Sequence, residues 1–144
     1  MNHAPRIIFI AALAAAGLAG VAQAEDVSLS AHLTGPAEKP TPGDTDGMGH
    51  ATVKLDTAKN QVCYTLMVEK IGQPIAAHIH KGAADVAGPV AVPLSPPDSS
   101  GKSEACVDAD AAVVKDIAAN PGGYYVNVHT ADFKAGAIRG QLSK

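Results

Sequence analysis

The sequence contains no tryptophan and few other aromatic residues, with three tyrosines and two phenylalanines in 144 residues. Its two cysteines are far apart, so no C-x-x-C spacing supports a metal site built on cysteine. No run of five or more basic residues occurs, and the formal net charge is −3. The sequence therefore lacks the cluster of basic residues that is typical of nucleic-acid-binding proteins. The mild negative charge identifies no protein partner.

Long hydrophobic runs are also scarce. The uncharged run at residues 7–22 is shorter than the roughly 20 residues that a membrane-spanning helix needs. Arg6 precedes this run and Ala22-Gln23-Ala24 follows it, a pattern typical of a cleaved secretory signal peptide. We expect removal of residues 1–24, which leaves residues 25–144 as one secreted or periplasmic domain without a membrane anchor. A domain of that length has no room for a two-domain dinucleotide enzyme.

Alternating apolar and polar residues recur along the rest of the chain, and this alternation is typical of half-buried strands. The pattern and the punctuation by Gly, Pro, Asn and Asp predict about eight short strands, at residues 27–33, 51–56, 61–70, 74–81, 90–94, 104–108, 124–129 and 137–142. One short helix is predicted near residues 110–119, capped by Asp108 or Asp110 and ended by Asn120-Pro121-Gly122-Gly123. The sequence thus predicts an all-β fold, a Greek-key or immunoglobulin-like antiparallel sandwich or barrel.

Cys63 and Cys106 both fall on the polar faces of their predicted strands. An even number of cysteines in an exported protein favours a disulfide. Two outward cysteines on neighbouring strands of one sheet can pair without disturbing the core. The alternative is two free buried thiols.

Five histidines follow the expected cleavage site, and three of them suggest a metal site. In the segment His78-Ile79-His80 the two imidazoles leave the same face of one strand, about 6.6 Å apart at the backbone. In the later strand Val126 and Val128 form the apolar face, so Tyr125, Asn127 and His129 point the opposite way. If the two strands are neighbours, three imidazoles meet on the outer face, a ligand set that suits copper or zinc.

Simpler interpretations of these residues remain open. The two histidines of an H-x-H segment on a half-buried strand can also be polar residues on the solvent-exposed face of the sheet, without a metal. Met48, His50 and His32 are possible additional ligands, since copper accepts a thioether and an imidazole. The alternative is that these three side chains face solvent and bind no metal. Arg139 is either a hydrogen-bond donor near the last strand or an edge charge that discourages aggregation.

Two longer segments carry a resemblance to a known family. They are Ala76-Ala77-His78-Ile79-His80-Lys81-Gly82-Ala83-Ala84 with Gly88-Pro89-Val90-Ala91-Val92-Pro93-Leu94, and Asn120-Pro121-Gly122-Gly123-Tyr124-Tyr125-Val126-Asn127-Val128-His129-Thr130 followed by Ile138-Arg139-Gly140-Gln141-Leu142. Together they resemble the CHRD domain, named after chordin, over about residues 27–142. The resemblance implies a secreted, mostly β, immunoglobulin-like domain, and it implies no established activity.

A fainter resemblance is to copper–zinc superoxide dismutase. That sandwich also ligates copper with an H-x-H strand and a later histidine, and His78, His80 and His129 match the ligands in type and order. The second cluster of histidines and an aspartate does not follow His80, where residues 82–89 offer only Asp85. A dinuclear site is therefore not expected.

Three hypotheses of function follow. The first is a non-enzymatic binding protein that holds a single copper or zinc ion through His78, His80 and His129. The second is an extracellular or periplasmic structural or protein-interaction module without metal, and the third is a mononuclear copper redox enzyme. No catalytic residue is predicted, because the sequence has no G-x-S-x-G elbow and no phosphate-binding glycine pattern.

Overall fold

The computed structural model describes residues 26–144, and the expected signal peptide at residues 1–24 lies outside the described residues. The described chain forms eight strands, one α-helix and two single-turn 3-10 helices. The strands are β1 (Asp26–Thr34), β2 (Met48–Asp56), β3 (Gln61–Glu69), β4 (Pro74–Lys81), β5 (Val90–Leu94), β6 (Lys102–Asp108), β7 (Tyr124–Thr130) and β8 (Ile138–Gln141). The helices are η1 (Gly35–Ala37), α1 (Ala111–Ala119) and η2 (Pro121–Gly123). The predicted all-β fold with one short helix is confirmed.

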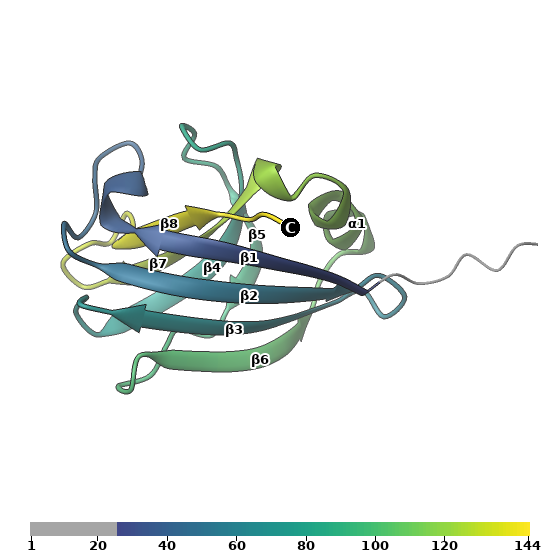
Figure 1. The fold of residues 1–144 in the computed structure, drawn as a ribbon, viewed down its shortest axis with the longest axis horizontal. Coiled ribbons are helices and arrows are strands. Elements are labelled where there is room, and N and C mark those ends of the chain that lie inside the picture. The colour runs from purple at the N-terminus through teal and green to yellow at the C-terminus, as the bar shows by residue number, and fades with distance from the viewer. Residues whose placement is uncertain (1–25) are drawn as a thin grey trace, which may run out of the picture.

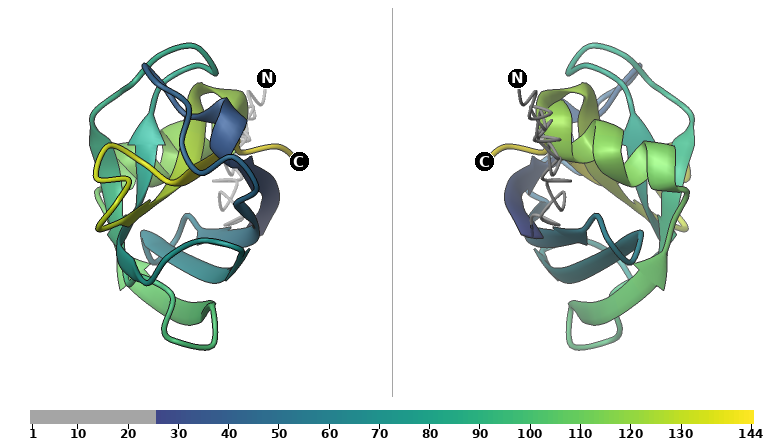
Figure 2. Two further views of the ribbon diagram at one scale, coloured as in Figure 1. Left: turned by 90° about the vertical axis from the view of Figure 1, so that its left-hand side faces the viewer. Right: turned by 90° about the vertical axis from the view of Figure 1, so that its right-hand side faces the viewer.

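All strand pairs are antiparallel, and they form one sheet in the order β5-β4-β7-β8-β1-β2-β3-β6. The sheet curls on itself, so that β1, β2, β3 and β6 face β8, β7, β4 and β5 across the core (Figure 1). Seen from its ends, the strands surround the core almost completely, and α1 lies across one end (Figure 2). The fold is therefore a nearly closed barrel or sandwich, as the sequence predicts.

The core consists of the inward residues of every long strand. Leu29, Val53, Leu66, Ile79 and Val126 are each at most 2 % exposed, and they belong to five different strands. Because successive side chains of a strand point to opposite faces, the same alternation sends the histidines and cysteines outward. With few aromatic residues available, aliphatic side chains supply most of the buried apolar surface.

Two local features fix the ends of the elements. The Asp110 carboxylate accepts hydrogen bonds from the amides of Ala112 and Val113, at 2.8 and 3.3 Å, and so caps α1. Helix α1 buries Val114 and Ile117 against the core, and Asn120 ends it before η2. The helix N-cap predicted as Asp108 or Asp110 is therefore Asp110.

Cys63 and Cys106 lie directly opposite each other on β3 and β6 and form a disulfide. The bond fastens β6, an end strand of the sheet, to β3 without entering the core, as the expected outward placement requires. Within residues 26–144 no helix has the length and apolar character needed to cross a membrane.

Candidate metal centre

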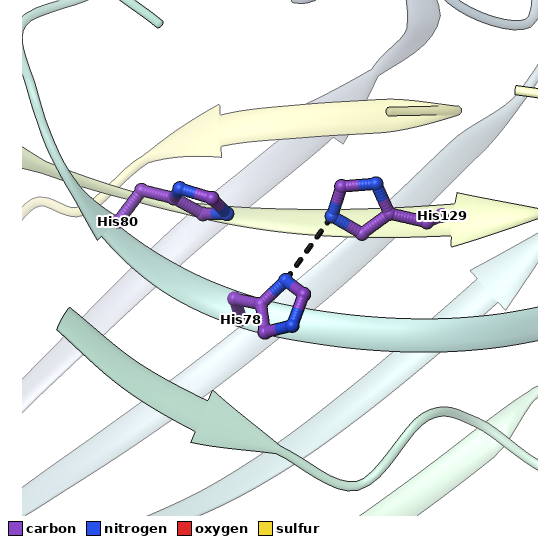
Figure 3. Close-up of side chains that lie close together, drawn as sticks. All are labelled: His78, His80 and His129. Atoms are coloured by element: carbon purple, nitrogen blue, oxygen red, sulfur yellow. Dashed lines mark hydrogen bonds between the residues drawn. The ribbon is translucent and has the colours of Figure 1, made fainter. Parts of the chain in front are cut away.

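The pairing of β4 with β7 brings His78, His80 and His129 together. His78 lies opposite Asn127 and His129 lies opposite Ala76, so the two histidines are diagonal neighbours on adjacent strands. The inward neighbours Ile79 and Val128 are fully buried, which turns the three histidines to the outer face. The rings gather there, with centroids 5.0 Å apart for His78 and His129 and 5.3 Å for His78 and His80 (Figure 3). We call these three residues the histidine cluster.

Each ring of the cluster offers one nitrogen to a common point. The three candidate ligand atoms all lie within 4.8 Å of one another, and the rings are half-buried. Nδ1 of His78 and Nε2 of His129 are 3.1 Å apart. Two nitrogens bound to one tetrahedral zinc ion at 2.0–2.1 Å lie about 3.3 Å apart. The geometry of this pair therefore fits ligation of one ion, and the ligand nitrogen of His80 lies within 4.8 Å of both atoms.

Backbone carbonyls set the protonation of two of the rings. Nδ1 of His80 donates to the Gly88 carbonyl and Nδ1 of His129 donates to the Lys134 carbonyl, both at 2.9 Å. Because a carbonyl can only accept, each neutral ring keeps its lone pair on Nε2. Nε2 of His80 is buried and has no hydrogen-bond partner in the described part of the chain. Such an orphaned acceptor is rare in folded proteins, and it faces the other two rings (Figure 3).

The surroundings of the cluster favour neutral imidazoles. Burial lowers the pKa of all three histidines below 6.5 and is the largest cause in each case. The charges of His129 and His80 lower the pKa of His78 further, and those of His129 and Arg139 lower that of His80. A metal ion binds the neutral ring, so these groups are in the binding form at neutral pH.

Tyr125 and Gly88 hold His80 in place. The Tyr125 ring stacks on the His80 ring with centroids 5.0 Å apart and planes 5° from parallel. The Gly88 amide donates to the Tyr125 hydroxyl at 3.0 Å, while the Gly88 carbonyl accepts from His80. A Cβ atom at Gly88 would lie 1.7 Å from the Lys81 carbonyl oxygen, so only glycine fits here. One loop residue thus fixes both the stacked tyrosine and the ring tautomer of His80.

Arg139 holds the loop at residues 82–89 against the sheet. Its guanidinium lies 3.4 Å from the centre of the Tyr125 ring and donates to the carbonyls of Val86 and Ala83, at 2.9 and 2.6 Å. The side chain is 1 % exposed. Its interpretation as an edge charge is therefore wrong, because the loop covers it, and its interpretation as a hydrogen-bond donor is confirmed.

A second loop, between η1 and β2, carries a buried carboxyl group. Glu38, in the loop between η1 and β2, is 2 % exposed and accepts a hydrogen bond from the Asn127 amide nitrogen. Burial raises the pKa of Glu38 to about 7, although the Arg139 charge and the Lys39 amide act in the opposite direction. Tyr125 and Asn127 do point outward from β7, as predicted, but loops cover them and leave them 3 % and 2 % exposed.

Sequence reasoning did not identify Glu38, Gly88 or Tyr125 as parts of this region. Gly88 stands inside a segment of the family resemblance, so its position carried a signal, but the contacts of Gly88 and Glu38 depend on how two loops fold back. The alternation of β7 gave the direction of Tyr125 and gave no sign that the outer face is covered.

Met48, His50 and His32 do not join the histidine cluster. They lie on β1 and β2, and β8 separates β1 from β7 in the sheet. Within residues 26–144, His78, His80 and His129 form the one group of three or more His, Cys, Asp or Glu side chains that can hold a metal ion. Met48, His50 and His32 instead line a separate hollow with Met67.

Comparison with known proteins identifies the family. The family model of the CHRD domain matches residues 29–142, nearly the whole described chain. No curated protein and no solved structure shows significant similarity to the chain. The match includes the strands that carry the histidine cluster and both loops that cover the outer face of β7. The chain is a member of the CHRD domain family.

Proposed function

We propose that the chain is an exported CHRD-domain binding protein that holds a single copper or zinc ion through His78, His80 and His129. One observation carries the proposal: three ring nitrogens converge within 4.8 Å of one another. Two of the rings have their tautomers set by backbone carbonyls, and one of those offers a buried lone pair without a partner. Second contacts of this kind are typical of histidines that ligate metals. The ligand atoms are Nδ1 of His78 and Nε2 of His80 and His129.

Export is part of the proposal and has two supports. Residues 1–24 have the composition of a signal peptide, with a basic start and a short apolar segment. The disulfide between Cys63 and Cys106 is typical of proteins of the periplasm or the extracellular space. We therefore place the mature domain, residues 25–144, in an oxidising compartment.

A second candidate function is a structural or protein-interaction module without metal. It is favoured by the hydrogen bonds that His80 and His129 make to Gly88 and Lys134, which connect the sheet to two loops. The contact between His78 and His129 also satisfies one nitrogen of each ring without an ion. This candidate predicts no stoichiometric metal and a loss of thermal stability when the histidines are removed.

Copper and zinc titration by calorimetry, with metal analysis of the loaded protein, tests the two candidates. The proteins are the chain, a His78→Ala/His80→Ala/His129→Ala variant and a His32→Ala/His50→Ala control. All three are prepared as the mature domain, residues 25–144, which begins with Glu25 and lacks the proposed signal peptide. With Zn²⁺, we expect one equivalent for the parent and for the control, and none for the triple variant.

Equal uptake by the parent and the triple variant would overturn the metal proposal. If the triple variant unfolds, the single variant His129→Gln replaces it, since glutamine keeps a hydrogen-bond donor near Lys134. Three protein ligands also leave a coordination position open, which a mononuclear copper redox enzyme requires. Superoxide dismutation by the copper-loaded chain that is no faster than by free copper would remove that third candidate.

A further inference from the structure

The histidines and methionines of the described chain gather in two places. Three of the five histidines form the histidine cluster. The other two, His32 and His50, line a surface hollow of about 180 Å³ together with Met48 and Met67. These are the only methionines in residues 26–144. We call these four residues the soft-donor hollow.

Strand register places the four side chains side by side. His32 on β1 lies directly opposite His50 on β2, and His50 lies directly opposite Met67 on β3. Side chains directly opposite in an antiparallel pair have Cβ atoms about 4.5–5.5 Å apart. Met48 precedes His50 by two residues on β2, so it leaves the same face. The donors therefore lie side by side on three adjacent strands, β1, β2 and β3 (Figure 1).

Core packing does not explain the two thioethers. Met67 is 51 % exposed and Met48 is 37 % exposed, and both are among the five large apolar side chains exposed in the described chain. The inward residues of the same strands, such as Val53 and Leu66, already fill the core. The methionines thus stand on the outer face beside two imidazoles, with their sulfur atoms available to a ligand.

We propose that the soft-donor hollow is a second metal site, which binds Cu⁺ through the thioethers of Met48 and Met67 and the imidazoles of His32 and His50. Thioether sulfur is a soft ligand that favours Cu⁺ over Zn²⁺, and imidazole binds copper in either state. The histidine cluster offers nitrogen alone, so the two sites differ in the metal that they prefer. Glu69 lies on the rim opposite Met48, where its negative charge favours a cation. This proposal does not depend on metal binding by the histidine cluster.

Methionine methyl resonances give a direct test. The probe is Ag⁺, a soft monovalent ion without redox chemistry, added to the chain labelled with ¹³C at the methionine methyl groups in chloride-free buffer. We expect the Met48 and Met67 resonances to shift together and to saturate at one equivalent. The variants Met48→Leu and Met67→Leu assign the two signals, because leucine keeps the side-chain volume. Added Cu⁺ is expected to displace the Ag⁺.

Variants separate the two sites. A His32→Gln/His50→Gln variant should lose about tenfold or more in Ag⁺ affinity at the methionines, since removing a ligand costs at least as much as removing its supporting contacts. His78→Gln should leave both methionine shifts unchanged. The proposal is wrong if the shifts fail to saturate at one equivalent, or if they persist at full affinity without His32 and His50. Failure of metal binding in the calorimetric test of the histidine cluster would leave this result unaffected.

Discussion

The histidine cluster and the soft-donor hollow are built in the same way and differ in what surrounds them. Both place outward side chains of adjacent antiparallel strands next to one another. At the cluster, loops fold over the outer face and bury the adjoining Tyr125, Asn127 and Arg139 to 3 % exposure or less. At the hollow, the outer face stays bare, and Met67 is half exposed.

The comparison separates two contributions to a site. Register alone places donor side chains of adjacent strands next to one another, and it does so at both places. At the cluster, covering loops add fixed tautomers for His80 and His129, and burial lowers the pKa of all three histidines. The rings of His32 and His50 make no hydrogen bond within residues 26–144. Breaking the cover should therefore reduce the stability of the protein far more than the substitution of a methionine at the hollow does.

The largest effect is expected from Gly88→Ala. The added methyl carbon would meet the Lys81 carbonyl at 1.7 Å, and backbone must move to relieve the overlap. Because Gly88 also bonds to His80 and Tyr125, we expect a loss of about 3 kcal/mol in the free energy of unfolding. Zinc affinity of the cluster should fall about tenfold or more. Denaturant unfolding and calorimetry measure both quantities.

Gly122→Ala is the matched control, because no atom lies within 4 Å of the position its Cβ would take. An unstrained exchange of this kind shifts stability by about 1 kcal/mol or less. Equal losses at Gly88 and Gly122 would contradict the role of the covering loop.

The sequence predicted the direction of side chains better than their surroundings. Alternation placed His78, His80 and His129 outward and Ile79 and Val128 inward, and the eight strands, the helix and the disulfide partners follow from the same local patterns. These features depend on neighbours in sequence or on one strand pairing. The strands, the helix and the disulfide could therefore be predicted from the sequence.

The sequence could not predict that loops cover the outer face of β7, because these loops contact strands that are far away in the sequence. Glu38 contacts Asn127 from 89 residues away, and Arg139 contacts Val86 from 53 residues away. A polar residue on an outward position, such as Arg139, looks like a solvent-facing charge until such a loop is placed. Met67 lies on the outer face of β3, and only the register of β2 and β3 puts it beside His50.

An intermediate effect is expected at the buried carboxyl of the covered face. The pKa of Glu38 in the folded protein is about 7, above its ordinary value of 4.5. The folded state then keeps a proton that the unfolded state releases between these values. This contribution to stability is complete below about pH 4.5 and is lost as the pH rises through 7. The difference between the two pKa values corresponds to about 3 kcal/mol at most.

Glu38→Gln should remove this dependence, since glutamine stays neutral and still accepts from Asn127. We expect the variant to gain about 2 kcal/mol in stability relative to the parent between pH 4.5 and pH 8. The two proteins differ only at residue 38, so the contributions of all other groups cancel in the difference. Glu69→Gln, on the bare rim of the hollow, is the control exchange. A parent-to-variant difference that stays constant with pH would count against a protonated Glu38.

The smallest effect is expected at the hollow itself. Met48→Leu and Met67→Leu keep side-chain volume on a bare face, and neither thioether packs in the core. Each should change the free energy of unfolding by about 0.5 kcal/mol or less, measured by denaturant unfolding without metal. His80→Leu, by contrast, leaves the Gly88 carbonyl without its donor at a half-buried position and should cost about 1–3 kcal/mol. Comparable losses at Met67 and His80 would mean that the hollow is as tightly built as the cluster. Small losses would leave soft-metal affinity as the property that Met48 and Met67 supply.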